Sequence, residues 1–298
     1  MDRIYIQELV RSFQVGLLDR RQFLSRVTKV VGSAAAAQML LTACQHSNGD
    51  NPDEVVQGTR NEQVPSEPVV AAGIVSAMVD YPGGEDGLMG YLARPDDDAA
   101  HPAVIVIQEW WGVNENIKDI TRRFAEEGFV ALSPDLYHGQ VVSEPDAARS
   151  LAISLDRDAA VQEIQSAIDY LQQQSFVSVQ KVGTIGFCMG GWLSLQTAVD
   201  EADVGASVAF YGRPLTAGEV GSIQAPVMGN YGANDRGIPV ANVEAMQTAL
   251  TEAGIENDIK IYDGADHAFF NDTRPSYHEE ASKDAWERTL GWFRKYLV

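Results

Sequence analysis

From residue 69 onward, short apolar runs rich in β-branched residues alternate with segments in which apolar residues recur at helical spacing. This alternation is typical of a mostly parallel sheet that is covered by helices on both faces. The run 103–107 is apolar at every position, as expected of a strand that is buried on both faces. The segments 73–79 and 88–93 are expected to form a hairpin across the turn residues Pro82 and Gly83.

The remaining elements follow from the same spacing. Strands are predicted over 129–133, 181–187, 206–210, 225–230 and 259–262, and helices over 115–127, 158–174, 189–199, 240–253 and 277–298. Gly128 and Gly254 each follow a predicted helix and are expected to end it, because glycine adopts the left-handed conformation of a helix C-terminus without strain. The order of the elements predicts an α/β fold.

The N-terminal residues do not share this alternation. The segment 19–24 reads Asp-Arg-Arg-Gln-Phe-Leu and resembles the twin-arginine export motif. A weakly apolar run over 30–41 follows, and it is too short for a comfortable transmembrane helix. The run leads into Leu-Thr-Ala-Cys at 41–44, which resembles a bacterial lipobox with Cys44 as the residue that receives lipid.

These features divide the chain into three expected parts. Residues 1–44 form an export signal, residues 45–72 form a flexible tether rich in polar residues, Gly and Pro, and residues 73–298 form one α/β domain. The protein would then be a periplasmic or cell-envelope lipoprotein that touches the membrane through its lipid anchor only. The alternative is a cytoplasmic protein whose first residues form an amphipathic helix that contains an Arg-Arg pair by coincidence.

Composition narrows the possible partners. The 298 residues include 42 acidic and 22 basic ones, which gives a net charge of −20 at pH 7. Non-specific binding of nucleic acid needs clustered Lys and Arg, so nucleic acid is not expected as a partner. The chain has two cysteines. With lipid on Cys44, Cys188 would be a lone thiol in an oxidising compartment, and therefore a candidate reactive residue.

The surroundings of Cys188 match a nucleophile elbow. The segment 186–191 reads Gly-Phe-Cys-Met-Gly-Gly, and it joins a predicted strand to a predicted helix. The turn is so tight that side chains at the glycine positions would collide with the neighbouring strand and helix. The N-terminus of the helix behind Cys188 carries partial positive charge, which favours a thiolate. The alternative is a buried cysteine beside an ordinary strand–helix turn.

Two further residues complete a candidate triad. Asp235 follows the strand over 225–230, and His267 follows the last predicted strand, so the chain order is nucleophile, acid, histidine, as in α/β-hydrolases. Asp235 could instead cap a helix or a turn, and His267 could be a hydrogen-bonded structural residue. Asp266 and His267 also suggest a metal pair, but no further His or Cys has suitable spacing, so neither a metal nor a cofactor is expected.

Five motifs together carry a resemblance to a known family. They are Gln-Glu-Trp-Trp-Gly-Val-Asn at 108–114, Pro-Asp-Leu-Tyr at 134–137, the elbow at 186–191, Asp235, and Gly-Ala-Asp-His-Ala-Phe at 264–269. Over roughly 73–298 the chain resembles the dienelactone hydrolase family. The resemblance implies an α/β-hydrolase fold, with a mostly parallel central sheet and helices on both faces. It also implies an ester or lactone hydrolase of the carboxymethylenebutenolidase kind.

The resemblance assigns further roles. Glu109 matches the family glutamate that contacts the resting thiol and takes part in its activation. The backbone N–H groups of Trp110 and Met189 match the oxyanion hole. The arginines with which well-known members hold a substrate carboxylate are replaced here by Gly139 and Asn271.

Four residues are candidates for contact with the substrate. Arg274 lies three residues beyond Asn271 and is the candidate replacement for a family arginine. Trp111, Tyr137 and Phe269 are candidate substrate-binding aromatics. Plain packing is the alternative for the aromatic residues.

Three functions remain open at this point. The first is hydrolysis of a small-molecule ester or lactone, in which Cys188 forms an acyl-enzyme with the help of His267 and Asp235. The second is a thioesterase or another acyl hydrolase that uses the same triad. The third is a surface lipoprotein that keeps the fold as a binding module without turnover. The ordered triad favours an enzyme, because a binding module does not need the three groups together.

Overall fold

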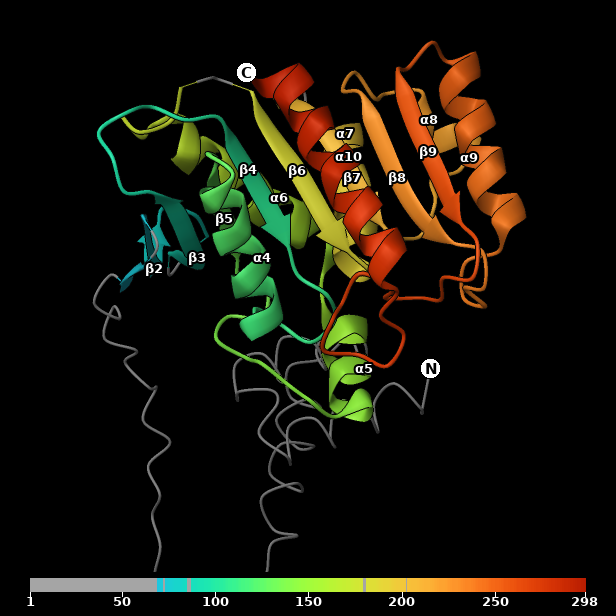
Figure 1. Ribbon diagram of the computed structural model, residues 1–298, viewed down its shortest axis with the longest axis horizontal. Helices are drawn as coiled ribbons and strands as arrows, with labels where there is room; N and C mark the ends of the chain where they lie inside the picture. The colour runs from blue at the N-terminus through green and yellow to red at the C-terminus, as the bar shows by residue number, and fades with distance from the viewer. Residues whose placement is uncertain (1–68, 72, 85–86, 179–180, 202) are drawn as a thin grey trace, which may run out of the picture. The chain divides into compact units, whose positions relative to one another are not determined.

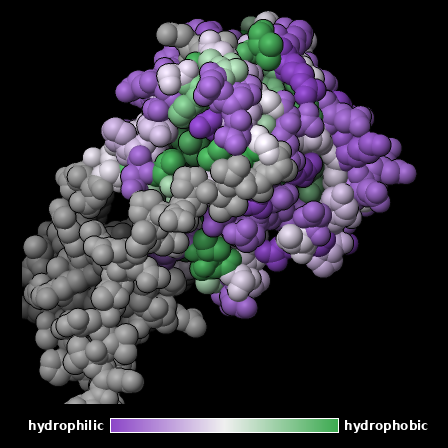
Figure 2. All heavy atoms as spheres, turned by 60° about the vertical axis from the view of Figure 1, so that its left-hand side comes forward, coloured by the Kyte–Doolittle hydropathy of each residue, from purple (hydrophilic) through white to green (hydrophobic). Residues whose placement is uncertain are grey.

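The computed structural model describes residues 69–71, 73–84, 87–178, 181–201 and 203–298. The expected export signal, its lipidation residue Cys44 and residues 45–68 of the expected tether lie outside the described residues. No helix in the described part of the chain is long and apolar enough to cross a membrane. Most of the coloured surface in Figure 2 is hydrophilic. The exposed large hydrophobic residues in the described ranges are Val141, Ile153, Tyr277 and Val298.

The centre of the fold is one sheet with the strand order β1-β2-β3-β5-β4-β6-β7-β8-β9 (Figure 1). In this order, the neighbouring strands from β1 to β5 pair antiparallel. From β5 to the end of the sheet, all neighbouring strands are parallel. The strands are β1 (Val69–Ala71), β2 (Ile74–Tyr81), β3 (Leu88–Pro95), β4 (Ala103–Ile107), β5 (Val130–Pro134), β6 (Val182–Phe187), β7 (Val204–Phe210), β8 (Val227–Gly232) and β9 (Asn257–Tyr262).

Helices cover both faces of this sheet. In Figure 1, α4 and α10 lie in front of the strands, and α6 and α7 lie behind them. The helices are α4 (Glu115–Glu126), α5 (Pro145–Ser154), α6 (Arg157–Gln172), α7 (Met189–Asp200), α8 (Ala217–Val220), α9 (Val240–Glu252) and α10 (Glu279–Leu297). The predicted α/β-hydrolase architecture is confirmed, and most predicted elements agree with the observed ones within two or three residues.

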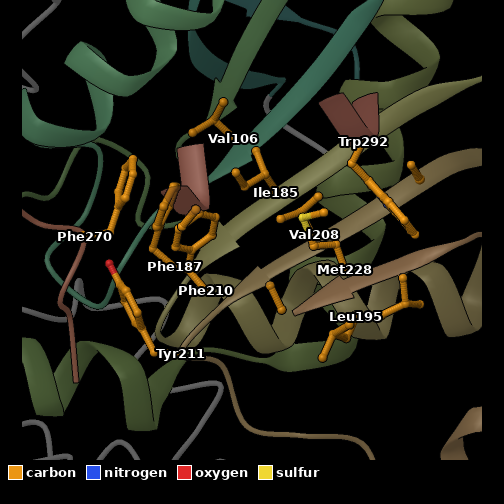
Figure 3. Packing of buried hydrophobic residues seen from close by; sticks show 14 of the residues in the cluster. Val106, Ile185, Phe187, Leu195, Val208, Phe210, Tyr211, Met228, Phe270 and Trp292 are labelled. Atoms are coloured by element: carbon orange, nitrogen blue, oxygen red, sulfur yellow. The ribbon is translucent and has the colours of Figure 1, made fainter. Parts of the chain in front are cut away.

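Strand β4 shows why a parallel strand needs apolar residues at every position. Val104 and Val106 belong to the core on the side of α4 and α10, whereas Ile105 and Ile107 belong to the core on the side of α6. Successive side chains of a strand point to opposite faces, so both faces of β4 are buried. Figure 3 shows the first of these cores, in which Val106, Ile185 and Val208 project from neighbouring strands.

Three elements were not predicted. Strand β1 lies inside the expected tether 45–72 and pairs antiparallel with β2, so the sheet begins before residue 73. Three residues are too few to show a period. Helix α5 begins with Pro145 and buries only Ala148 and Leu151, so its sequence has little helical periodicity. Helix α8 is a single turn of four residues, held by a capping box between Thr216 and Glu219.

Candidate active site

Cys188 lies at the turn between β6 and α7, where the sequence predicts the elbow. Its backbone has φ 55° and ψ −114°, which a residue with a side chain seldom adopts. Such a conformation costs about 1–3 kcal/mol and persists where surrounding structure enforces it. Here the Cys188 N–H donates to the carbonyl oxygen of Phe210, 3.0 Å away on β7. The side chain is partly exposed and faces two cavities.

The glycines of the elbow are required by close backbone contacts. A Cβ on Gly186 would lie 1.9 Å from the carbonyl oxygen of Gly190. A Cβ on Gly190 would lie 2.4 Å from the carbonyl oxygen of Ile107. Both contacts are with backbone and not with a flexible side chain, so the turn could not accept either Cβ without opening.

Asp235 and His267 follow neighbouring strands of the sheet and meet at its edge. Asp235 follows β8 and is 6% exposed, and its Oδ1 accepts hydrogen bonds from the N–H groups of Gly237 (2.8 Å) and Ile238 (3.1 Å). Its Oδ2 lies 2.6 Å from Nδ1 of His267, which follows β9. A carboxylate only accepts hydrogen bonds, so Nδ1–H is the donor. Nε2 is then the nitrogen left for the thiol of Cys188, which lines the same two cavities as His267.

The electrostatics of His267 depend on both neighbours. Burial alone would lower the pKa of the imidazole, because burial disfavours its charged form. The hydrogen bonds and negative charges of Asp235 and Cys188 outweigh burial and raise the pKa from 6.5 to about 10. When Cys188 is a thiolate, His267 therefore stays protonated at neutral pH. The arrangement can hold a thiolate–imidazolium pair, which is the pair that nucleophilic attack and leaving-group protonation both need.

Glu109 follows β4 and is buried. It lines one of the two cavities that Cys188 faces. Its Oε1 accepts a hydrogen bond from the Tyr211 hydroxyl (3.2 Å), and its Oε2 accepts one from the Asn271 side-chain amide (3.1 Å). Burial raises the pKa of Glu109 above its ordinary value, and the hydrogen bonds from Asn271 and Tyr211 oppose this only in part. Glu109 shares a cavity with Cys188, but its described hydrogen bonds go to Tyr211 and Asn271 and not to the thiol.

Tyr211 is a site residue that the sequence did not reveal. It follows β7 with a positive φ of 39° and is 1% exposed. Its ring contacts the ring of His267, with centroids 5.1 Å apart, and Figure 3 shows it beside the aromatic cluster of Phe187 and Phe210. Burial and the charge of Glu109 raise the pKa of Tyr211 well above 10, so its hydroxyl remains a hydrogen-bond donor. Only the tertiary structure brings this hydroxyl to Glu109.

Asn271 stands where the family resemblance places an arginine. It is 1% exposed and uses its amide nitrogen on Glu109, while its Oδ1 accepts from the N–H (3.1 Å) and the hydroxyl (2.6 Å) of Thr273. Its polar atoms are therefore engaged inside the protein. Gly139, at the other expected arginine position, donates its N–H to Oδ2 of Asp135 at 2.6 Å.

The backbone N–H groups of Trp110 and Met189 are the expected oxyanion hole. Trp110 lines both cavities that reach Cys188, and Met189 is the first residue of α7. Within the described ranges, no oxygen accepts a hydrogen bond from either backbone N–H.

A first cavity of about 540 Å³ opens beside the triad. It is lined by Glu109, Trp110, Trp111, Cys188, His267, Ala268, Arg274, Pro275 and Ser276. The Arg274 guanidinium lies 4.0 Å from the centre of the Trp111 ring, and its Nε has no hydrogen-bond partner among the described residues. The structure therefore brings two of the four predicted substrate-binding residues, Trp111 and Arg274, to a cavity beside Cys188.

The other two predicted substrate-binding residues are core residues. Phe269 is fully buried and packs against Tyr262 (ring centroids 5.2 Å apart) and Tyr211 (5.6 Å), so packing explains it. Tyr137 is 4% exposed, and its hydroxyl lies 3.5 Å from the sulfur of Met189. Neither residue lines the cavities at Cys188. In the part of the chain that the structure describes, no group of three His, Cys, Asp or Glu side chains could hold a metal ion.

Comparison with known proteins places this chain in a family. The chain matches the dienelactone hydrolase family over residues 88–297. A protein of Methylorubrum extorquens, provisionally named carboxymethylenebutenolidase, is 35% identical over 243 residues, which cover 76% of this chain and 84% of that protein. A protein of Escherichia coli with the same provisional name is 35% identical over 240 residues, which cover 75% of this chain and 88% of that one.

Solved structures agree with this assignment. The crystal structure of a protein from Klebsiella pneumoniae, provisionally named dienelactone hydrolase, is 33% identical with a TM-score of 0.70, and the match covers 75% of this chain and 99% of that one. A dienelactone hydrolase-like promiscuous phosphotriesterase from metagenomic libraries is 27% identical with a TM-score of 0.69, over 76% of this chain and all of that chain. The chain belongs to the dienelactone hydrolase family and has the α/β-hydrolase fold of its members.

Proposed function

We propose that this protein hydrolyses carboxylic esters or lactones through an acyl-enzyme on Cys188. The observation that carries the proposal is the Asp235–His267 hydrogen bond, with Cys188 held at the elbow in the wall of the cavity that His267 also lines. Membership of the dienelactone hydrolase family supports the reaction class. The relatives named carboxymethylenebutenolidase support a lactone or ester as substrate.

In the proposed reaction, the Cys188 thiolate attacks the substrate carbonyl carbon while His267 holds the proton. The tetrahedral intermediate collapses as His267 gives that proton to the departing oxygen, and an acyl-thioester remains on Cys188. His267 then takes a proton from water, and the hydroxide attacks the thioester carbonyl. Collapse releases the carboxylic acid and returns the sulfur. Asp235 holds the imidazole in one tautomer and orientation throughout.

The N–H groups of Trp110 and Met189 are the proposed oxyanion hole. Neither group has a protein acceptor within the described residues, so both can donate to a substrate oxygen. The Met189 N–H also lies at the N-terminus of α7, where the helix dipole stabilises negative charge. Losing one such donor typically lowers kcat by about a hundredfold to a thousandfold.

Glu109 is proposed to control ionisation of the thiol. A buried carboxylate in the cavity of Cys188 opposes a second negative charge there, so the thiolate is harder to form in the empty site. Glu109→Gln removes this charge and keeps the side-chain size. The pH profile of alkylation by iodoacetamide should therefore shift in the variant. Identical profiles for variant and parent would rule out the role.

Arg274 is proposed to hold an anionic substituent close to the reacting carbonyl. Stacking on Trp111 fixes the plane of the guanidinium and leaves N–H groups for a carboxylate. This places a positive charge in the first cavity, although Gly139 and Asn271 stand where the resemblance predicts the family's arginines.

We also propose that the chain is an exported lipoprotein. The proposal depends on the sequence pattern of residues 1–44, with the paired arginines before an apolar run and Cys44 at its end. A cytoplasmic protein is the alternative.

Turnover of p-nitrophenyl acetate and of a small lactone panel tests the proposed activity. The parent should release acid from at least one of them, and iodoacetamide should abolish turnover. Cys188→Ala should keep the circular dichroism spectrum and lose activity by orders of magnitude, as in other triads. Activity of Cys188→Ala above about a tenth of the parent value would exclude Cys188 as nucleophile.

A second candidate activity is hydrolysis of phosphotriesters. The likeness to a structure named as a promiscuous phosphotriesterase favours it. Paraoxon supplied in excess of the protein distinguishes repeated turnover from a single covalent reaction at Cys188.

A further inference from the structure

A second cavity of about 490 Å³ also reaches Cys188 and His267. Its walls come from α5, the first turn of α6, the start of α7 and the segment after β7. Apolar side chains, among them Ile153 and Met189, form part of its lining. Three arginines line it as well: Arg149, Arg157 and Arg213. We call this space the arginine chamber.

The charge of the arginine chamber is opposite to that of the protein. The chain carries a net charge of −20, yet no Asp or Glu lines this cavity. Arg213 forms an ion pair with Glu219 at 2.8 Å, and Glu219 does not line the cavity. Arg149 and Arg157 make no ion pair with any described residue. Two exposed positive charges in the wall of the cavity are therefore left without a described carboxylate partner.

The arginines are also partly fixed in place. The guanidinium groups of Arg157 and Arg213 each lie 4.9 Å from the centre of the Trp192 ring. A guanidinium that stacks on an aromatic ring keeps its N–H edge free for a planar or tetrahedral anion. Side chains that are already ordered lose less freedom when they bind a ligand. Isolated surface arginines are usually solvated, but here three converge on a cavity that leads to the nucleophile.

We propose that the arginine chamber binds an anionic group at the far end of the substrate. The preferred substrates would be esters or thioesters that carry an apolar arm ending in a carboxylate or a phosphate. The scissile carbonyl lies at Cys188, the arm packs against the apolar side chains of the chamber, and the anion binds Arg149 and Arg157. This inference rests on the proposed esterase function and names its substrate class.

The test compares neutral and anionic esters in one protein. The neutral substrate is p-nitrophenyl hexanoate, and the anionic ones are the p-nitrophenyl monoester of adipic acid and a phosphonate-terminated ester of the same chain length. The variant is Arg149→Gln/Arg157→Gln, whose changes lie at exposed positions. The matched control is Lys181→Gln/Lys283→Gln, which removes two exposed positive charges that do not line the chamber.

In the arginine variant, kcat/KM for at least one anionic ester should fall about tenfold or more, because the hydrogen bonds between the charged guanidinium groups and the anion of the substrate are lost. For the neutral ester, kcat/KM should stay within about twofold of the parent value. The control should leave both values within the same range. The two anionic probes show whether a carboxylate or a phosphate is preferred. Equal losses for neutral and anionic esters, or an equal loss in the control, would overturn the proposal.

A binding measurement separates this proposal from the proposed function. Adipate and the matching phosphonate are titrated calorimetrically into Cys188→Ala, with and without the two arginine substitutions. The arginine substitutions should weaken Kd for one ligand about tenfold or more. If the parent hydrolyses no ester but this difference in Kd is found, the proposed esterase function is wrong and anion binding by the arginine chamber is supported. If neither ligand binds to Cys188→Ala, the proposal that the arginine chamber binds an anion is wrong.

Discussion

Gly186→Ala tests whether the tight elbow is what positions Cys188. The added Cβ would lie 1.9 Å from the Gly190 carbonyl oxygen, whereas real Cβ contacts essentially never fall below 3.0 Å. The strand and the helix must therefore separate by about 1 Å, since both sides of the contact are backbone. Overpacking of this kind destabilises by about 1–3 kcal/mol. A displacement of about 1 Å at a reacting group lowers the rate about a hundredfold.

The two expected effects are measured separately. Thermal unfolding should show a Tm lower by about 2–12 °C, since about 1 kcal/mol corresponds to about 2–4 °C in a domain of this size. At a temperature where the variant is folded, kcat/KM on p-nitrophenyl acetate should be about a hundredfold lower. The loss of activity would then be much larger than the unfolded fraction could explain.

Gly291→Ala is the matched control, because a Cβ there would meet no atom within 4 Å. Gly291 lies inside α10, where alanine is favoured over glycine by about 1 kcal/mol, so this variant should be as stable as the parent or more so. Its activity should be unchanged. If Gly186→Ala kept full kcat/KM, or if both variants lost activity equally, the elbow would not be the feature that fixes the sulfur.

Three further changes test other parts of the molecule. Burial lowers the pKa of His267 but its partners raise it to about 10, so stability from its pairing is complete below about pH 6.5 and is lost as pH rises through about 10. Asp235→Asn should therefore lower Tm more at pH 6 than above pH 10, and an equal drop at both would contradict the pairing. Tyr211→Phe removes a donor to buried Glu109 and should destabilise by about 1–3 kcal/mol in urea unfolding, whereas a change below about 0.5 kcal/mol would contradict the network. Cys44→Ala should move the protein from the membrane to the soluble fraction with activity intact, and an unprocessed chain in the host cytoplasm would contradict export.

Local patterns explain which parts of the fold the sequence could predict. Strand β4 is predicted at its observed bounds, because every one of its side chains is apolar and buried. The elbow is predictable because its glycines form a short motif between a strand and a helix, although only the Gly186 contact with Gly190 is local and the Gly190 contact with Ile107 is not. Helix α5 has only two buried residues and no clear period, and without it the sequence did not indicate that Arg149 lines a cavity that reaches Cys188.

Other parts of the site depend on contacts between distant segments. Tyr211 and Asn271 are far from Glu109 in sequence, and only the folded sheet brings all three together. No motif marks such a group in advance. Phe269 shows the reverse case, because its position beside His267 suggests a substrate contact while its ring points into the core. Proximity to a catalytic residue in sequence does not fix the direction of a side chain.

The net charge of −20 and the arginines near Cys188 act over different distances. At physiological ionic strength charges are screened beyond about 8 Å, so acidic residues elsewhere on the surface repel an approaching anion only weakly. Arg149 and Arg157 would touch a ligand in the arginine chamber directly, and Arg274 would touch one in the first cavity. Contact at hydrogen-bond distance is much less affected by screening. An acidic protein can therefore select an anionic substrate, provided that its cations lie where the substrate binds.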